Sequence, residues 1–210
     1  MKFTVAIDGP AAAGKGTIAR AVAAEFGFAY LDTGLLYRAV GMLAQSGGEI
    51  NEIDAVAAAR NLSVAVLARP DLRGATAADA ASKVAVLPLV RESLLNYQRV
   101  FARQDGGAVL DGRDIGTVIC PDAEAKLFVT ADVAERARRR HLELVEGGTQ
   151  IALEQVLQDV KTRDRRDASR GIAPMKAAQD VLLLDTTKLS IDAAVTSAVT
   201  NIRKIMQGLD

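Results

Sequence analysis

Residues 3–17 read FTVAIDGPAAAGKGT and decide the fold of this chain. Residues 3–7 form a short apolar run rich in β-branched side chains, which predicts a buried strand. Asp8-Gly9-Pro10 ends the run with a tight loop. From residue 15 to residue 26 apolar side chains recur at helical spacing, so the loop joins a strand to a helix.

The loop matches the pattern G-x-x-x-x-G-K, with Thr17 one place later than in its commonest form. Glycine and alanine let backbone N–H groups approach phosphate oxygens, and the following helix adds its N-terminal dipole. The alternative is a plain glycine-rich turn, but the strand before and the helix after favour a phosphate site. We expect a nucleoside triphosphate to bind Gly9, Pro10, Ala11, Ala12, Ala13, Gly14, Lys15, Gly16 and Thr17.

Further strands and helices alternate along the rest of the chain. Strands are expected at residues 28–31, 108–110, 126–129 and 181–184, and helices at 33–45, 91–103, 133–145, 151–169 and 190–205. Asp32 or Thr33 caps the first of these helices, which stops before Gly47-Gly48, and Ser190 caps the last. This alternation predicts an α/β fold of the P-loop NTPase type, a parallel sheet flanked by helices within one domain, residues 1–210.

Two segments depart from the regular alternation. Residues 61–90 read as a small insertion, in which residues 62–66 fit a short strand and the rest has no strong period. The pair Gly147-Gly148 joins two helices and predicts a flexible joint in a lid of residues 143–170. The basic residues Arg136, Arg139 and Arg140 flank this lid and either touch phosphates or face solvent.

Composition narrows the class of protein. Lys plus Arg and Asp plus Glu number 26 each, so no net field attracts nucleic acid. Half of the residues are apolar, yet no run reaches the ~20 residues that span a bilayer. The N-terminus does not resemble a signal peptide, and the single Cys120 forms no internal disulfide. We expect a monomer in the reducing cytoplasm, with no membrane or nucleic-acid partner.

A phosphate loop alone does not identify the acceptor. Asp111 follows the apolar run 108–110 and would hold Mg²⁺ together with Thr17. Arg38 lies one turn into the helix after the second strand, where it faces the same crevice, and its planar guanidinium suits an acceptor phosphate. No N-K-x-D motif is present, which disfavours a GTPase.

The whole chain resembles the bacterial cytidylate kinases. The resemblance rests on five motifs in order: IDGPAAAGKGT, LDTGLLYR, DAASKVAVLPLVRESLL, DGRDIGT and RDRRDASRGIAP. Adenylate, shikimate and gluconate kinases share only the first. The resemblance implies ATP and Mg²⁺ on the phosphate loop, CMP or dCMP opposite, and transfer of the γ-phosphate from one to the other.

The resemblance also implies roles at matching positions. Ser82, Arg91 and Asp114 read cytosine, with Thr33 in place of the family's serine and Asp32 beside it. Arg38, Arg113 and Arg170 hold the acceptor phosphate, and Arg163 and Asp167 meet the ribose. The catalytic set is Lys15, Arg113, Arg163 and Arg170.

Several alternatives stay open. Arg163, Asp167 and Arg170 share one face if their segment is helical, but such a run is also a normal solvent face. The insertion is too short for the small antiparallel sheet usual in the family, although Leu72-Arg73 keeps its place, so we expect a trimmed wall on the base side. Two other functions remain possible interpretations of the sequence: a kinase that acts on UMP or AMP, and a non-catalytic nucleotide-binding module.

Overall fold

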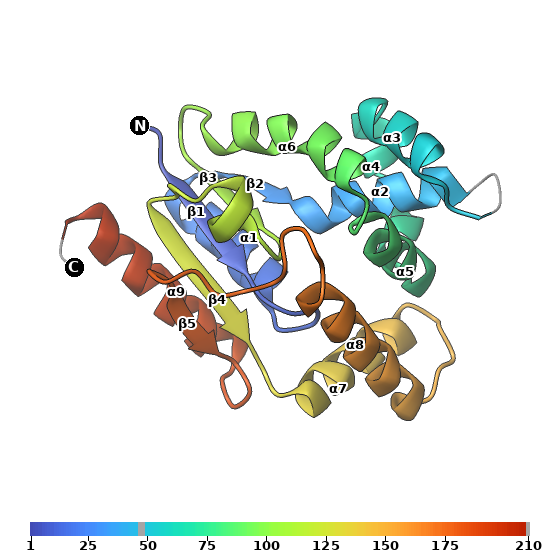
Figure 1. The fold of residues 1–210 in the computed structure, drawn as a ribbon. Helices are drawn as coiled ribbons and strands as arrows, with labels where there is room; N and C mark the ends of the chain where they lie inside the picture. The colour runs from blue at the N-terminus through green and yellow to red at the C-terminus, as the bar shows by residue number, and fades with distance from the viewer. Residues whose placement is uncertain (46–48, 209–210) are drawn as a thin grey trace.

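The computed structural model describes residues 1–45 and 49–208, so the predicted stop at Gly47-Gly48 lies outside the described residues. Its centre is a sheet of five strands in the order β2-β3-β1-β4-β5 (Figure 1). Every pairing is parallel, which confirms the predicted α/β fold. The strands are β1 (Thr4–Asp8), β2 (Ala29–Asp32), β3 (Ala108–Asp111), β4 (Ala125–Thr130) and β5 (Leu182–Asp185).

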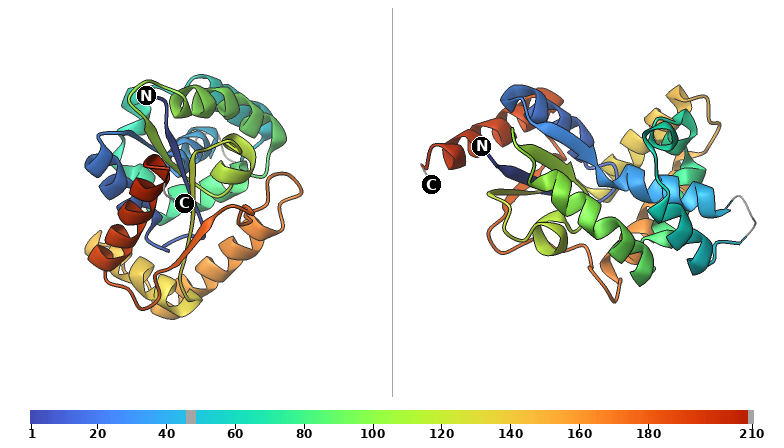
Figure 2. Two further views of the ribbon diagram at one scale, coloured as in Figure 1. Left: turned by 90° about the vertical axis from the view of Figure 1, so that its left-hand side faces the viewer. Right: turned by 90° about the horizontal axis from the view of Figure 1, so that it is seen from above.

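Helices cover both faces of the sheet because successive strand residues point to opposite sides (Figure 2). Val5 and Ile7 pack in one core cluster with α1 (Lys15–Phe26) and α9 (Ile191–Met206). Ala6, between them in sequence, packs in a second cluster with α6 (Pro88–Ala102). Short apolar runs therefore become strands buried on both faces, as parallel sheets require.

The chain between β2 and β3 is helical. It contains α2 (Thr33–Gln45), α3 (Glu52–Arg60), α4 (Val64–Leu67), the 3₁₀ turn η1 (Pro70–Arg73) and α5 (Ala75–Val84) before α6. The strand expected at residues 62–66 is wrong. Ser63 instead caps α4, its Oγ accepting the Val66 N–H at 3.4 Å.

Helices α2 and α5 approach each other closely at Gly41. A Cβ on Gly41 would lie 2.6 Å from the carbonyl carbon of Ala80. The two backbones therefore meet without an intervening side chain at this point. Helix α5 reaches the sheet edge through α2, which begins directly after β2.

Helices α7 (Val133–Glu146) and α8 (Leu153–Ala168) form a separate pair below the sheet in Figure 1. Their contact has its own apolar cluster of Ala137, Leu144, Val156 and Val160. Gly148 in the joining turn has a φ of +83°, a backbone conformation that glycine adopts without strain.

A π-helical turn, η2 (Ile115–Ile119), lies between β3 and β4. The predicted cap Ser190 of α9 is confirmed, because its Oγ accepts the Ala193 N–H at 3.1 Å. Of the residues that the structure describes, none belongs to a helix long and apolar enough to cross a membrane.

Candidate functional site

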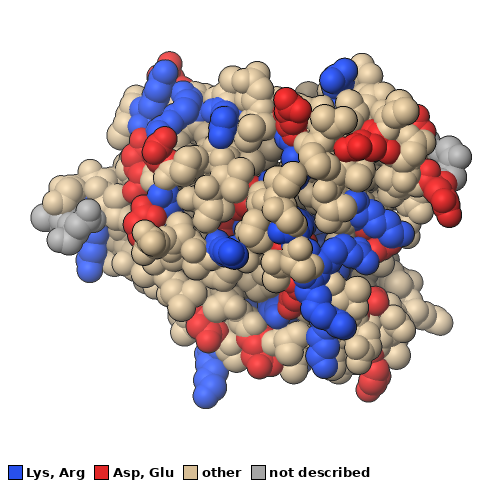
Figure 3. Space-filling view, viewed as in Figure 1, with Lys and Arg blue, Asp and Glu red and all other residues tan. Residues whose placement is uncertain are grey.

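The carboxyl ends of β1, β2 and β3 open on one cavity of about 320 Å³. Figure 3 shows Lys and Arg side chains gathered over the hollow between α2–α6 and the α7–α8 pair. Of the predicted site residues, most line this cavity: Ala11, Ala12, Gly14, Lys15, Gly16, Thr17, Asp32, Thr33, Arg38, Ser82, Arg91, Asp111, Arg113, Asp114, Arg163, Asp167 and Arg170. Gly9, Pro10 and Ala13 do not; they are buried behind it.

The phosphate loop has the backbone shape that its glycines allow. Gly9 has a φ of +139°, and a Cβ there would lie 1.9 Å from the Val129 carbonyl oxygen. Gly14, at φ +94°, precedes the first turn of α1 and has no side chain to cap it. The first N–H groups of α1 are therefore available to an anion.

Lys15 extends along this loop. Its Nζ donates to the Pro10 carbonyl at 2.8 Å. Burial, together with the nearby Arg113 charge, lowers the pKa of Lys15 to about 7, against the opposing pull of Asp111. A phosphate bound beside Lys15 would favour its charged form.

Asp111 and Thr17 line the same end of the cavity. Among the described residues, Asp111 Oδ1 is buried and has no hydrogen-bond partner. Burial and then the charge of Asp32 raise the pKa of Asp111 to about 7. The same part of the chain holds no group of three or more His, Cys, Asp or Glu positioned for a metal. Mg²⁺ bound mainly by phosphates needs only one or two protein oxygens, so this donor set fits it.

Asp32 and Thr33 have local roles as well. Asp32 is the cap of α2, since its Oδ1 accepts the Leu35 N–H at 3.1 Å. The Thr33 hydroxyl donates to the Asp111 carbonyl at 2.7 Å, which ties α2 to the end of β3. These bonds position the strand ends that carry the charged groups.

Arg91 and Asp114 form a buried ion pair at the inner end of the cavity, where Ser82 and Tyr37 also line the wall. The Arg91 guanidinium lies 5.9 Å from the centre of the Tyr37 ring. A carboxylate beside a guanidinium and a hydroxyl offers both acceptors and donors to a flat polar ring.

The other arginines surround Asp167. Arg113 Nε donates to Asp167 Oδ2 at 2.9 Å, and Arg170 donates to the second oxygen of the same carboxylate. Arg163 is half-buried beside them, and desolvation, with the charge of Arg113, lowers its pKa to about 10. Arg38 donates to the Leu72 carbonyl at 3.3 Å. Arg163 and Asp167 lie on α8, whereas Arg170 follows the end of that helix at Ala168, and all three line the cavity.

Three guanidinium nitrogens in this cavity are buried without an acceptor among the described residues. They are Arg91 Nη1, Arg163 Nε and Arg170 Nε. An unsatisfied buried donor costs about 1–3 kcal/mol, more when charged. Together they predict an anionic, polar ligand whose oxygens supply the missing acceptors.

Of the three basic residues expected to flank the lid, only Arg140 lines the cavity. Arg136 is buried and forms two hydrogen bonds to Asp164, at 2.7 and 3.1 Å. Arg139 donates to Glu135 and Thr186 instead. Helix periodicity could not separate these positions, because Asp164 lies on α8 and Thr186 follows β5.

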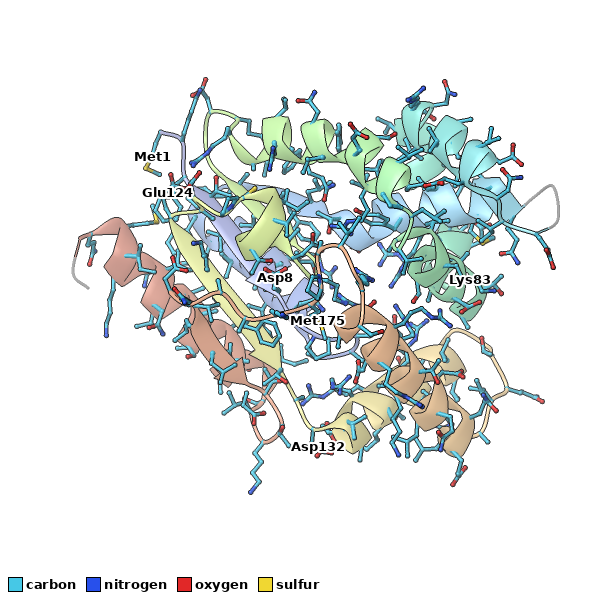
Figure 4. The ribbon with its side chains drawn as sticks, viewed as in Figure 1. Met1, Asp8, Lys83, Glu124, Asp132 and Met175 are labelled. Atoms are coloured by element: carbon cyan, nitrogen blue, oxygen red, sulfur yellow. The ribbon has the colours of Figure 1, made fainter. Side chains whose placement is uncertain are left out.

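Sequence reasoning missed Asp8. Its carboxylate accepts the N–H groups of Ile115 at 2.8 Å and Gly116 at 2.7 Å, so it fixes η2 beside the phosphate loop (Figure 4). It also missed other residues that line the cavity. Arg20 could have been found, because it lies three residues after Thr17 on α1 and therefore on the same side of that helix. The missed lining residues include Arg20, Tyr37 and Glu143.

A glycine-rich phosphate loop facing a second pocket of arginines defines a P-loop phosphotransferase. The chain belongs to the cytidylate kinase family, whose family model matches residues 5–204. A cytidylate kinase of Cereibacter sphaeroides is 64% identical over 200 residues, which cover 95% of this chain and 94% of that protein. A cytidylate kinase of Xanthobacter autotrophicus is 55% identical over 198 residues, with 94% and 95% covered.

Solved structures agree on the fold. An uncharacterized protein from Eubacterium ventriosum superimposes with a TM-score of 0.58 at 14% identity, covering 96% of this chain and 98% of that one. A sugar kinase from Janibacter sp. gives a TM-score of 0.50, also at 14% identity, covering 97% and 95%. At this identity the likeness concerns the fold alone.

Proposed function

We propose that this chain transfers the γ-phosphate of ATP to CMP or dCMP, giving ADP and CDP or dCDP. The family supports the reaction. The observation that carries it is the set of unpaired guanidinium nitrogens of Arg91, Arg163 and Arg170, in one cavity with the phosphate loop. A second nucleotide with its own phosphate would satisfy those donors.

In this proposal the ATP phosphates lie on the backbone of residues 9–17, with Lys15 beside the β- and γ-phosphates. Thr17 and Asp111 hold Mg²⁺, which would neutralise phosphate charge as the bond breaks. The donor end of the site is therefore built from the first loop and the end of β3.

The acceptor nucleotide lies at the other end of the cavity. Asp114 accepts the exocyclic amine of cytosine, and Arg91 and Ser82 donate to its ring acceptors. Arg38, Arg113 and Arg170 hold the acceptor phosphate, and Arg163 and Asp167 meet the ribose. Residues 61–90 carry the acceptor-binding segment and residues 143–170 the lid.

An oxygen of the acceptor phosphate attacks the γ-phosphorus while the bond to the β–γ bridging oxygen breaks and ADP leaves. The attacking oxygen is already anionic, so no strong general base is needed. Lys15 and the arginines orient the two nucleotides and neutralise their combined charge.

An assay of ADP release with a panel of acceptors tests the reaction. CMP and dCMP should each give acceptor-dependent ADP release, and UMP, AMP and shikimate should give far less. A preference for UMP or AMP would replace the proposed acceptor. ATP binding without ADP release for any acceptor would indicate a nucleotide-binding module instead.

A further inference from the structure

Arg166 connects the lid to the acceptor-binding segment. It lies on α8, and its Nη1 donates to Ser82 Oγ on α5 at 3.1 Å. The same Nη1 lies 3.3 Å from Asp79 Oδ1, also on α5. Asp79 and Ser82 are three residues apart, so one face of α5 presents both to the guanidinium.

The contact determines which way the Ser82 hydroxyl can act. A guanidinium has five N–H donors and no acceptor, whereas a hydroxyl has one donor and two lone pairs. When Arg166 donates to Ser82 Oγ, the Ser82 proton must point away from Arg166. Ser82 is 4% exposed and lines the main cavity, so its proton is free for an acceptor there.

We propose that Arg166 is a positioning residue that sets Ser82 as a hydrogen-bond donor and thereby increases discrimination of cytosine from uracil. The inference rests on the proposed function, because it concerns the base of the acceptor. Ring N3 of cytosine is an acceptor, whereas N3 of uracil carries a hydrogen. A hydroxyl held as a donor bonds the first and opposes the second.

The Arg166 contact is a bridge across a gap rather than part of a packed core. A second cavity of about 330 Å³ lies between α5 and the α7–α8 pair, and both Asp79 and Arg166 line it. The Arg166 side chain is 33% exposed. Because Arg166 belongs to the lid, Ser82 is oriented in this way only while the lid contacts α5.

Substitutions at Arg166 can separate the effect of its donor-only hydrogen bonding from the effect of its side-chain size. Arg166→Gln places an amide beside Ser82 that can accept as well as donate, so the hydroxyl is no longer held as a donor. Arg166→Lys keeps a group that only donates. Arg165→Gln is the matched control, since Arg165 is exposed and its Nε donates to the Lys161 carbonyl of its own helix.

The readout is the ratio of kcat/KM for CMP to kcat/KM for UMP. Arg166→Gln should lower this ratio roughly fivefold to thirtyfold, mainly through a higher KM for CMP, with the KM for ATP unchanged. Arg166→Lys should retain most of the ratio, and Arg165→Gln all of it. An unchanged ratio in Arg166→Gln, or equal losses in Arg166→Gln and Arg166→Lys, would overturn the proposal.

A double-mutant cycle with Ser82→Ala shows whether Arg166 acts through Ser82. In the Ser82→Ala background, Arg166→Gln should cause no further loss of discrimination. The same loss in both backgrounds would refute a role through the hydroxyl. If the wild-type chain itself does not use CMP, the proposed function fails, which is a different result from an unchanged ratio in an active enzyme.

Discussion

At the scale of single residues, the site combines buried charges that partly neutralise one another. Asp114 pairs with Arg91, and Asp167 pairs with Arg113 and Arg170. Each carboxylate keeps its guanidinium partners from being isolated charges in a buried site, which would be strongly destabilising. The donors left over are directed at the cavity, so the unliganded site is already arranged for an anion.

Lys15→Met tests the donor half of the site. The substitution removes the charge beside the β- and γ-phosphates and the bond to the Pro10 carbonyl, while leaving a side chain of similar length. We expect kcat to fall by roughly 10²- to 10³-fold, as when other preorganised charge-stabilising groups are removed. Steady-state kinetics measures this, with circular dichroism as the control for folding. A folded Lys15→Met protein with normal turnover would contradict the assignment.

Asp8 provides a pH-dependent test. Burial raises the pKa of Asp8 from its ordinary 3.8 to about 6, despite its two backbone hydrogen bonds. Between these values the folded chain holds a proton that the unfolded chain has lost, so this group's contribution to the free energy of unfolding decreases as pH rises from 4 to 6. The stability of the wild type relative to Asp8→Asn should fall by roughly 2–3 kcal/mol over that range.

Urea unfolding of the wild type and Asp8→Asn at pH 4 and pH 7 measures this difference. Groups that titrate equally in the two proteins cancel in the comparison. A difference that stays constant with pH would mean that Asp8 has an ordinary pKa.

At the scale of elements, the close contact of α2 with α5 sets the position of Ser82. Gly41→Ala would place a Cβ 2.6 Å from the Ala80 carbonyl carbon, so the helices must separate. We expect the KM for CMP to rise severalfold and the free energy of unfolding to drop by about 1–3 kcal/mol, with little change in the KM for ATP. Gly171→Ala is the control, because a Cβ there meets no atom within 4 Å. Equal effects of the two substitutions would contradict the role of this contact.

The elements also show what the sequence could predict. The phosphate loop was predictable because glycines, an adjacent apolar strand and a following helix are all local signals. Residues 62–66 resembled a strand through their alternating apolar residues, but the Ser63 cap and the absence of a partner strand among the described residues made α4. Helix α5 is rich in alanine, the residue with the highest helix propensity, so composition was the local signal for this helix.

Site residues that belong to a sequence motif could be predicted. Site residues whose role depends on a partner far away in the sequence could not. Lys15, Arg91 and Asp114 were named from motifs and line one cavity. Arg166 was not, since its contact with Ser82 joins positions 84 residues apart. The Asp8 carboxylate similarly fixes a turn more than 100 residues away. Such contacts depend on how elements pack, which local patterns do not specify.

At the scale of the whole molecule, the sheet brings two anion pockets to opposite sides of one cavity. The phosphate loop joins β1 to α1, and the base-side wall includes residues of α5 and α6. Of the arginines around Asp167, Arg163 lies on α8, Arg170 follows α8, and Arg113 follows β3. In the proposed arrangement the two nucleotides would meet with their phosphate ends together, and closure of the proposed lid would exclude water.

A two-headed inhibitor tests this arrangement most directly. It is a dinucleotide in which cytidine and adenosine are joined 5′ to 5′ by a chain of five phosphates. We expect inhibition competitive with both ATP and CMP, with an affinity at least about a hundredfold above that of CMP, since linking adds the two binding energies. Competition with only one of the two substrates, or an affinity no better than that of CMP, would contradict the opposed pockets.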